Sequence, residues 1–196
     1  MKQKLIFATS NDKKLKEVRE IIGDRYEVIT FKDIHFEGEI PEPFDTIEEN
    51  SIYKANFFFE KTQLSCIAED SGLEVEFLNG RPSAYSARYA GEERNDIKNY
   101  EKVLAELGDT HHRNARFVSI ITFKDAHFQE VFEGYMNGNI SYTPRGSNGF
   151  GYDPIFIPEG FDKTNAELSP EEKNAISHRR KALDKLTRYF TSRFKE

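Results

Sequence analysis

The sequence has 196 residues, a length typical of one domain that buries its core without a disulfide or metal staple, and we expect residues 1–196 to form a single domain. Its 28 basic and 34 acidic residues are interspersed and give a net charge of −6, which disfavours a DNA or RNA backbone as a partner. Cys66 is the only cysteine, which excludes an internal disulfide and a thiolate zinc cage. Because no apolar run is long enough for a signal peptide or a membrane span, we expect a cytoplasmic protein.

The first predicted elements are a strand, a helix and a second strand. An apolar run at residues 4–9 predicts a buried strand. The helix that follows has apolar residues at helical spacing and Gly23 as its candidate C-cap, and residues 26–31 predict the second strand. This order is typical of an α/β sheet.

A loop rich in acids and proline is predicted at residues 32–45. The segment 46–49 has the spacing of a capping box, in which the Thr and Glu side chains satisfy each other's backbone N–H groups, so we expect a helix that continues to about Lys61. Residues 66–68 predict a short buried strand that ends in the turn-like residues 69–72.

The second half of the chain completes a mixed α/β pattern. Its predicted elements follow in chain order: a half-exposed strand at residues 73–77, a helix capped by Asp96, long antiparallel strands at 115–123 and 128–140, a glycine-rich loop at 146–151, a helix start at 169–172 and a last helix over about residues 177–194.

The first candidate site is the turn at residues 8–14, between the first strand and its helix. Ligands of α/β sheets bind outside the carboxyl ends of strands, and a helix N-terminus offers N–H donors to a phosphate. Thr9, Ser10, Asn11 and Lys14 add polar groups. The alternative is that Ser10 or Asn11 only caps the helix.

The second candidate site is formed by the adjacent acids Glu69 and Asp70, followed by Ser71. Carboxylate oxygens suit Mg²⁺, which takes its remaining ligands from water and substrate phosphates, and Asp70 can also accept a proton from a water. Glu42 is a further candidate ligand from the acidic loop. The alternatives are an ordinary turn for residues 69–72 and a solvated charge for Glu42.

The third and fourth candidate sites lie in the last third of the chain. Glycines flank Phe150 in the stretch 146–154, which allows close approach of a planar ligand to an aromatic ring; the alternative is a loop whose Phe fills the core. His178 and Arg179 follow Ser177, a good N-cap, and basic residues at a helix start favour an anionic ligand over an exposed basic turn.

Several motifs occur in a fixed order along the chain: Ala8-Thr9-Ser10-Asn11 with Lys14 and Glu17, Glu49-Asn50 with Lys54-Ala55, Ala68-Glu69-Asp70-Ser71-Gly72-Leu73, Tyr85-Ser86-Ala87-Arg88-Tyr89-Ala90-Gly91, Gly149-Phe150-Gly151-Tyr152-Asp153-Pro154 and Ile176-Ser177-His178-Arg179. Together, over about residues 4–190, they resemble the inosine triphosphate pyrophosphatase family. One departure is Ser83, where the family pattern usually has glycine.

The resemblance implies an elongated α/β domain with a central mixed sheet flanked by helices and two lobes around a cleft. It also implies a homodimer that uses Mg²⁺ to hydrolyse dITP, ITP or XTP to the monophosphate and pyrophosphate, which removes these purine nucleotides from the nucleotide pool.

The resemblance also implies the roles of individual residues. Asp70 is expected to accept a proton and to bind metal with Glu42 and Glu69, Lys54 to neutralise phosphate charge, and Ser71 to touch the substrate. The remaining substrate-binding residues it implies are Thr9, Ser10, Asn11, Asp12, Lys13 and Lys14 at the triphosphate, Phe150, Gly151, Tyr152 and Asp153 at the base, and Lys173, His178 and Arg179 along the nucleotide.

Two other functions remain open from the sequence. A pyrophosphatase of similar layout can act on modified pyrimidine triphosphates, and a nucleotide sensor can hold a triphosphate without hydrolysing it. The presence of Asp70 and Lys54 argues against the sensor, because binding alone needs no proton acceptor.

Overall fold

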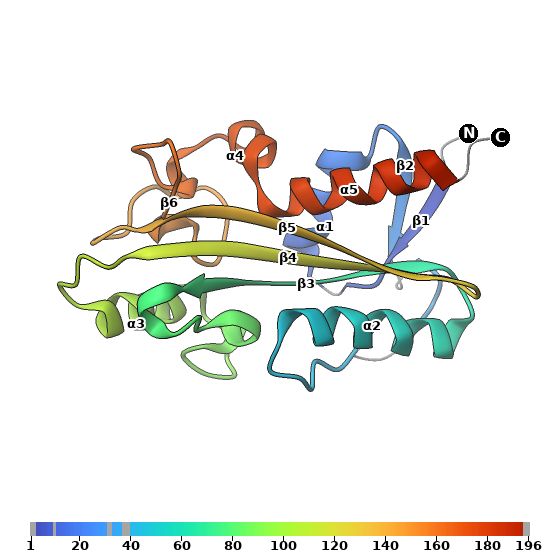
Figure 1. Cartoon of the computed structure of the whole chain (residues 1–196), viewed down its shortest axis with the longest axis horizontal. Helices are drawn as coiled ribbons and strands as arrows, with labels where there is room; N and C mark the ends of the chain where they lie inside the picture. The colour runs from blue at the N-terminus through green and yellow to red at the C-terminus, as the bar shows by residue number, and fades with distance from the viewer. Residues whose placement is uncertain (1–2, 10, 31–32, 37–39, 194–196) are drawn as a thin grey trace. The chain divides into compact units, whose positions relative to one another are not determined.

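The computed structural model describes residues 3–9, 11–30, 33–36 and 40–193. The chain has an α/β fold built on a six-stranded sheet with the strand order β2-β1-β3-β4-β5-β6 (Figure 1). β1 runs parallel to both β2 and β3, whereas β5 and β6 are antiparallel, so the sheet is mixed. The strands are β1 (Gln3–Phe7), β2 (Tyr26–Thr30), β3 (Cys66–Val75), β4 (Asn114–Lys124), β5 (Gln129–Ile140) and β6 (Phe156–Pro158).

Four of the α-helices begin at residues whose side chains satisfy orphan backbone N–H groups. Thr46 caps α2, and Ser169 forms a full capping box with Glu172 at the start of α4. The α-helices are α1 (Asp12–Ile22), α2 (Ile47–Thr62), α3 (Asp96–Leu107), α4 (Pro170–Ile176) and α5 (His178–Arg193), and the short 3₁₀ helices are η1 (Glu76–Leu78), η2 (Ser83–Arg88), η3 (Asp153–Ile155) and η4 (Asn165–Glu167).

The chain divides into two compact units. Unit 1 comprises Met1–Asp70, Ser119–Gly134 and Arg179–Glu196, and unit 2 comprises Ser71–Val118 and Tyr135–His178. The three long strands β3, β4 and β5 contribute residues to both units.

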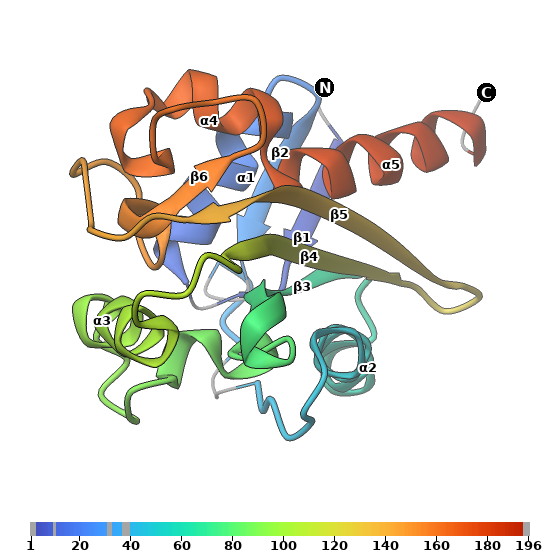
Figure 2. The ribbon, with the colours of Figure 1, turned by 60° about the vertical axis from the view of Figure 1, so that its left-hand side comes forward.

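Unit 1 is a sandwich of three layers. Within it, α2 covers one face of the sheet, and α1 and α5 cover the other (Figure 2). Phe58 of α2 packs with Cys66 and Ala68 of β3, whereas Ile67 packs with the helices of the opposite face. This alternation follows from strand geometry, in which successive side chains point to opposite faces. Cys66 is a buried apolar filler, and burial raises the pKa of its thiol to about 12.

Unit 2 has its own apolar core. Val103 and Leu107 of α3 pack with Leu73 and Val75 of β3, and the core continues over the inner residues of β4 and β5. Tyr152 also belongs to this core, and its hydroxyl donates to the backbone oxygen of Ser86 at 2.7 Å.

Most predicted elements are confirmed, but two predictions of local structure are wrong. Residues 69–72 are not a turn, because β3 continues through them to Val75. Gly72 serves a close approach instead: a Cβ at this position would lie 2.2 Å from the Ser83 backbone oxygen. The cap of α3 is Asn95 rather than Asp96, because the Asn95 side chain accepts the Lys98 N–H.

Ser83, at the position where the family pattern usually has glycine, has a φ of +50°. This is the left-handed region that glycine adopts most easily, so the backbone keeps a conformation suited to glycine although the residue is serine. Across the described ranges, no helix is long and apolar enough to span a membrane.

Candidate active site

The turn between β1 and α1 is a side-chain cap. The Asn11 side chain accepts the backbone N–H groups of Lys13 and Lys14 at 3.0 and 3.2 Å, and the Thr9 hydroxyl accepts the N–H of Asn11 at 3.1 Å. Asn11 is therefore the N-cap of α1, as one of the two interpretations of this turn predicts. Ser10, the other candidate, lies outside the described residues. Any phosphate role for this turn rests mainly on its basic side chains, such as the exposed Lys13; Asp12 is also exposed.

Glu69 lies in a buried charge network between β3, α1 and α5. Its carboxylate accepts the Ser119 hydroxyl at 2.7 Å and the Arg179 Nε at 2.9 and 3.1 Å, and the Lys14 Nζ is 3.9 Å away. Arg179 also pairs with Glu17. Glu69 and Arg179 are 2% and 1% exposed, which excludes an exposed basic turn at the start of α5.

Burial dominates the electrostatics of this network. It raises the pKa of Glu69, lowers the pKa of Lys14, and lowers that of Arg179 to about 10. Buried ions are tolerated when they are paired and hydrogen-bonded, which is the arrangement of Glu69 and Arg179.

Asp70 and Glu42 share the ammonium group of Lys54. The Lys54 Nζ donates to Asp70 Oδ1 at 3.1 Å, to Glu42 Oε1 at 2.8 Å and to the Glu69 backbone oxygen at 2.6 Å. Burial alone would lower the pKa of Lys54, but the carboxylates of Asp70 and Glu42 outweigh it, so the pKa is raised. Lys54 is therefore a cation held among carboxylates.

The loop that carries Glu42 is anchored to the start of α2. The buried Asn50 side chain accepts the Phe44 N–H at 2.9 Å and donates to the Phe44 oxygen at 2.8 Å. Asn50 thus fixes the backbone two residues from Glu42. The structure assigns no role to Asn50 beyond this anchor.

The two acids of β3 lie on opposite faces of the sheet. Glu69 shares a face with Ile67 and contacts residues of α1 and α5, whereas Asp70 shares a face with Ala68 and contacts Lys54 of α2. Among the described residues, no group of three His, Cys, Asp or Glu side chains is placed to hold a metal ion. This geometry favours Glu42 and Asp70 as the metal-facing pair and a pairing role for Glu69.

Asp70 retains an oxygen that fits a cation. Its Oδ2 is buried and has no hydrogen-bond partner within the described part of the chain, and the residue as a whole is only 5% exposed. A buried unpaired carboxylate oxygen is costly, and a hard divalent cation is the partner that such oxygens prefer. The donor set of Asp70 and Glu42 therefore fits Mg²⁺ completed by substrate and water.

The glycine-flanked loop of unit 2 is organised by Asp153. One carboxylate oxygen accepts the Phe150 N–H at 2.9 Å and the Lys173 Nζ at 2.7 Å, and the other accepts the Asn165 amide at 3.1 Å. Gly149 has a φ of +76°, and a Cβ there would lie 2.1 Å from Asp153, so both backbone and packing require glycine.

The ring of Phe150 lies beside Lys173 in this loop. Phe150 is half-buried, and the Lys173 Nζ lies 5.0 Å from its ring centroid. Tyr152, rather than Phe150, is the aromatic residue of the loop that enters the core, which weakens the alternative that Phe150 only fills the core. Gly151, between them, is partly exposed and donates its N–H to Asp96.

The remaining predicted residues of unit 2 are placed as follows. His178 opens α5, is buried, and stacks on Phe117 with ring centroids 5.0 Å apart. Lys173 is buried against Asp153, and Ser71 is a half-buried residue of β3.

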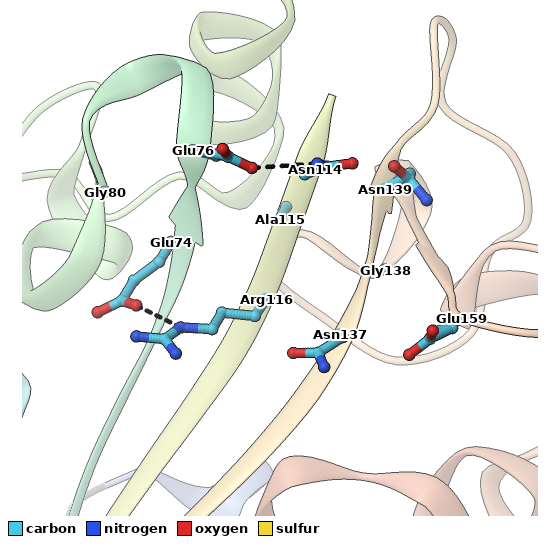
Figure 3. Close-up of a pocket in the computed structure, with 10 residues that line it drawn as sticks. All are labelled: Glu74, Glu76, Gly80, Asn114, Ala115, Arg116, Asn137, Gly138, Asn139 and Glu159. Atoms are coloured by element: carbon cyan, nitrogen blue, oxygen red, sulfur yellow. Dashed lines mark hydrogen bonds and ion pairs between the residues drawn. The ribbon is translucent and has the colours of Figure 1, made fainter. Parts of the chain in front are cut away.

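A cavity of about 500 Å³ also lies in unit 2, over the ends of β3, β4 and β5 (Figure 3). Glu74 pairs with Arg116 at 2.7 Å and Glu76 accepts the Asn114 amide at 3.0 Å in its wall. None of the sequence-predicted site residues lines it. It therefore does not support the predicted site.

Sequence reasoning missed several residues that organise these groups. Glu17 and Asn50 belong to the quoted motifs but received no role, Asp96 was predicted only as a helix cap, and Ser119 and Asn165 carry no local signal. The contacts of Ser119 and Asp96 join positions 50 and 55 residues apart in the chain.

The chain is similar to known proteins over nearly its whole length. The Ham1 family model matches residues 5–189. A curated relative from Flavobacterium psychrophilum, named dITP/XTP pyrophosphatase, is 46% identical over 95% of this chain and 98% of its own. A relative of the same name from Bacillus subtilis is 46% identical over 93% of this chain and 94% of its own.

Two solved structures are also similar to this chain over nearly its whole length. The Staphylococcus aureus Ham1 protein has a TM-score of 0.88 and 41% identity, covering 97% of this chain and 99% of its own. A HAM1 protein from Coxiella burnetii has a TM-score of 0.88 and 37% identity over the same shares of the two chains.

Proposed function

The chain belongs to the Ham1 family, and from this membership we propose that it hydrolyses the nonstandard purine nucleoside triphosphates dITP, ITP and XTP to the monophosphate and pyrophosphate. It is a hydrolase that acts on the anhydride bond next to the α-phosphorus, and its activity removes these nucleotides from the nucleotide pool. The observation that carries the proposal is the Asp70 carboxylate, whose Oδ1 accepts a hydrogen bond from Lys54 and whose buried Oδ2 has no hydrogen-bond partner among the described residues.

Glu42 and Asp70 are the proposed ligands of Mg²⁺. The buried Oδ2 of Asp70 supports this assignment, as does the position of Glu42 on the same ammonium group. The bound ion supplies Lewis-acid stabilisation of the negative charge on the triphosphate. Glu69 is not one of the proposed Mg²⁺ ligands, because its carboxylate already accepts hydrogen bonds from Arg179 and Ser119.

Asp70 is also the proposed proton acceptor. A water oxygen forms a bond to the α-phosphorus, the bond from that phosphorus to the bridging oxygen breaks, and the water proton passes to the Asp70 carboxylate. The Lys54 ammonium, 3.1 Å from Asp70, pairs with this carboxylate and is proposed to neutralise phosphate charge. Pyrophosphate is the leaving group.

The side chains around the start of α1 are proposed to hold the triphosphate. Lys14 is the strongest candidate because it is largely buried yet lies 3.9 Å from Glu69, beyond hydrogen-bond distance. Lys13 is exposed and adds a second cation. Thr9, Ser10, Asn11 and Asp12 complete the proposed turn, with Ser71 beside Asp70 in the sequence.

The loop at residues 149–153 is proposed to bind the purine base. Phe150 offers a ring for stacking, Gly151 and Tyr152 shape the loop, and Asp153 with Lys173 fixes it. Donors aimed at the 6-oxo group would be unpaired against adenine, which costs about 1–3 kcal/mol for each buried donor. His178 and Arg179 are proposed to contact the nucleotide as the family resemblance implies.

Three further parts of the proposal concern the whole protein. Residues 1–196 form a single pyrophosphatase domain, which the match of one family model over residues 5–189 supports. The resemblance supports a homodimer, and the net charge of −6 argues against a nucleic-acid partner. The cytoplasm is the proposed location because it holds the nucleotide pool on which the enzyme acts.

A pyrophosphate-release assay tests the proposal. Purified protein is incubated with ITP, XTP, dITP, dUTP, ATP and GTP, each with and without Mg²⁺. Fastest release from the 6-oxo purines ITP, XTP and dITP, dependent on Mg²⁺, is the expected result. Fastest turnover of dUTP would favour the pyrimidine alternative, and binding without turnover would favour the sensor.

A further inference from the structure

Asp96 contacts the proposed base-binding loop from a distant part of the chain. Its Oδ2 accepts the backbone N–H of Gly151 at 3.0 Å, across 55 residues of sequence. Asp96 is the first residue of α3, and both residues belong to unit 2. A rigid helix is therefore joined to the loop that carries Phe150.

Helix capping does not account for this contact. The cap of α3 is Asn95, whose side chain accepts the Lys98 N–H at 3.1 Å. An acid in the first helical turn gains only about 0.3–1 kcal/mol from the helix dipole. The hydrogen bond from Asp96 to Gly151 is a separate interaction of a charged acceptor, a class worth about 1.5–3 kcal/mol.

Two carboxylates hold the backbone of this loop, and we call each of these hydrogen bonds a clamp. Asp153 accepts the N–H of Phe150, and Asp96 accepts the N–H of the next residue, Gly151. Two successive backbone donors are therefore held by two carboxylates from separate elements. The glycines at 149 and 151 both have positive φ, so without these clamps the backbone around Phe150 has unusual freedom.

We propose that Asp96 is a positioning residue that fixes Gly151 and thereby presents the Phe150 ring to the purine base. This inference rests on the proposed role of Phe150 as the base platform. When the loop is already ordered in the folded protein, substrate binding does not have to order it. Loss of the hydrogen bond from Gly151 to Asp96 is therefore expected to weaken substrate binding. The chemical step, which uses Asp70 and Lys54, is not touched.

The test compares Asp96→Ala and Asp96→Asn with the control Glu101→Ala, which removes a carboxylate from an exposed position of the same helix. For Asp96→Ala we expect KM for ITP to rise about tenfold with kcat within about twofold of wild type, the loss of one charge-assisted hydrogen bond. Asp96→Asn keeps an acceptor oxygen, and its KM for ITP is expected to lie much closer to that of the wild type than the KM of Asp96→Ala does.

Amide hydrogen exchange of Gly151 provides a readout without turnover. Asp96→Ala is expected to accelerate this exchange about tenfold or more, while Glu101→Ala leaves it unchanged. An unchanged KM in Asp96→Ala, or an equal loss in Asp96→Asn and Asp96→Ala, overturns the positioning role. An unchanged Gly151 exchange overturns the clamp itself.

The two proposals can fail separately. KM is measured with whichever triphosphate the wild type hydrolyses fastest, so a different base preference does not affect the comparison. If the wild type hydrolyses no triphosphate, the proposed function is refuted, and so is the role of Asp96 in substrate binding. Amide exchange of Gly151 still decides whether Asp96 fixes the loop.

Discussion

Glu69 and Asp70 are consecutive residues of β3, and their carboxylates lie on opposite faces of the sheet. Glu69 reaches Arg179 of α5, whereas Asp70 reaches Lys54 of α2. Two adjacent acids therefore have different electrostatic partners. Substitutions of the two residues should separate activity from stability.

Asp70→Asn is expected to lower turnover by about 100-fold or more, the usual range for the loss of a general base. The substitution keeps the volume of the side chain, and Lys54 keeps its contact with Glu42, so the fold should persist. Steady-state pyrophosphate release measures turnover, and thermal unfolding measures the fold. Asp162→Asn, at an exposed position, is the control. Near-normal turnover in a folded Asp70→Asn variant would remove Asp70 from its catalytic role.

Glu69→Gln is expected to lower the free energy of unfolding by about 3 kcal/mol, because it leaves buried positive charge on Arg179 and Lys14 less compensated. Urea unfolding gives the measurement. Glu74→Gln in the same strand is a matched control, since its pair with Arg116 is partly exposed and should contribute less than about 1 kcal/mol. Equal effects of the two substitutions would contradict the buried network.

Gly72→Ala tests whether β3 runs straight past η2. The new Cβ would meet the Ser83 backbone oxygen at 2.2 Å and the Ser86 hydroxyl at 2.8 Å. Overpacking of this kind typically costs about 1–3 kcal/mol, and a clash with backbone belongs at the upper end. We expect a clear fall in the midpoint of urea unfolding. A variant as stable as wild type would show that η2 does not pack this closely.

The regular elements were predictable because their signals are local. Apolar periodicity placed most of the strands and helices within a few residues, and Ser169 with Glu172 forms a capping box at the helix start predicted for residues 169–172. At α2 the prediction was half right: Thr46 caps the Glu49 N–H, but the Glu49 carboxylate accepts the Thr46 hydroxyl.

The candidate site was harder to predict because its contacts are long-range. Residues 69–72 have the composition of a turn, and only the charges of Lys54 and Arg179, brought by two helices, allow acids inside a buried strand. Asp96 gave a similar error. Its position suggested a helix cap, whereas its hydrogen-bond partner lies 55 residues away.

Phe150→Ala is expected to raise KM for ITP about tenfold or more with little change in kcat, because base–aromatic stacking is worth about 1–3 kcal/mol per base. The backbone clamp from Asp153 to the residue 150 N–H remains in this variant, so the loop keeps its anchor. The control is Phe161→Ala, which removes a partly exposed ring from the same unit. An unchanged KM for ITP in Phe150→Ala would mean that the ring does not bind the base, even if the protein is an active pyrophosphatase.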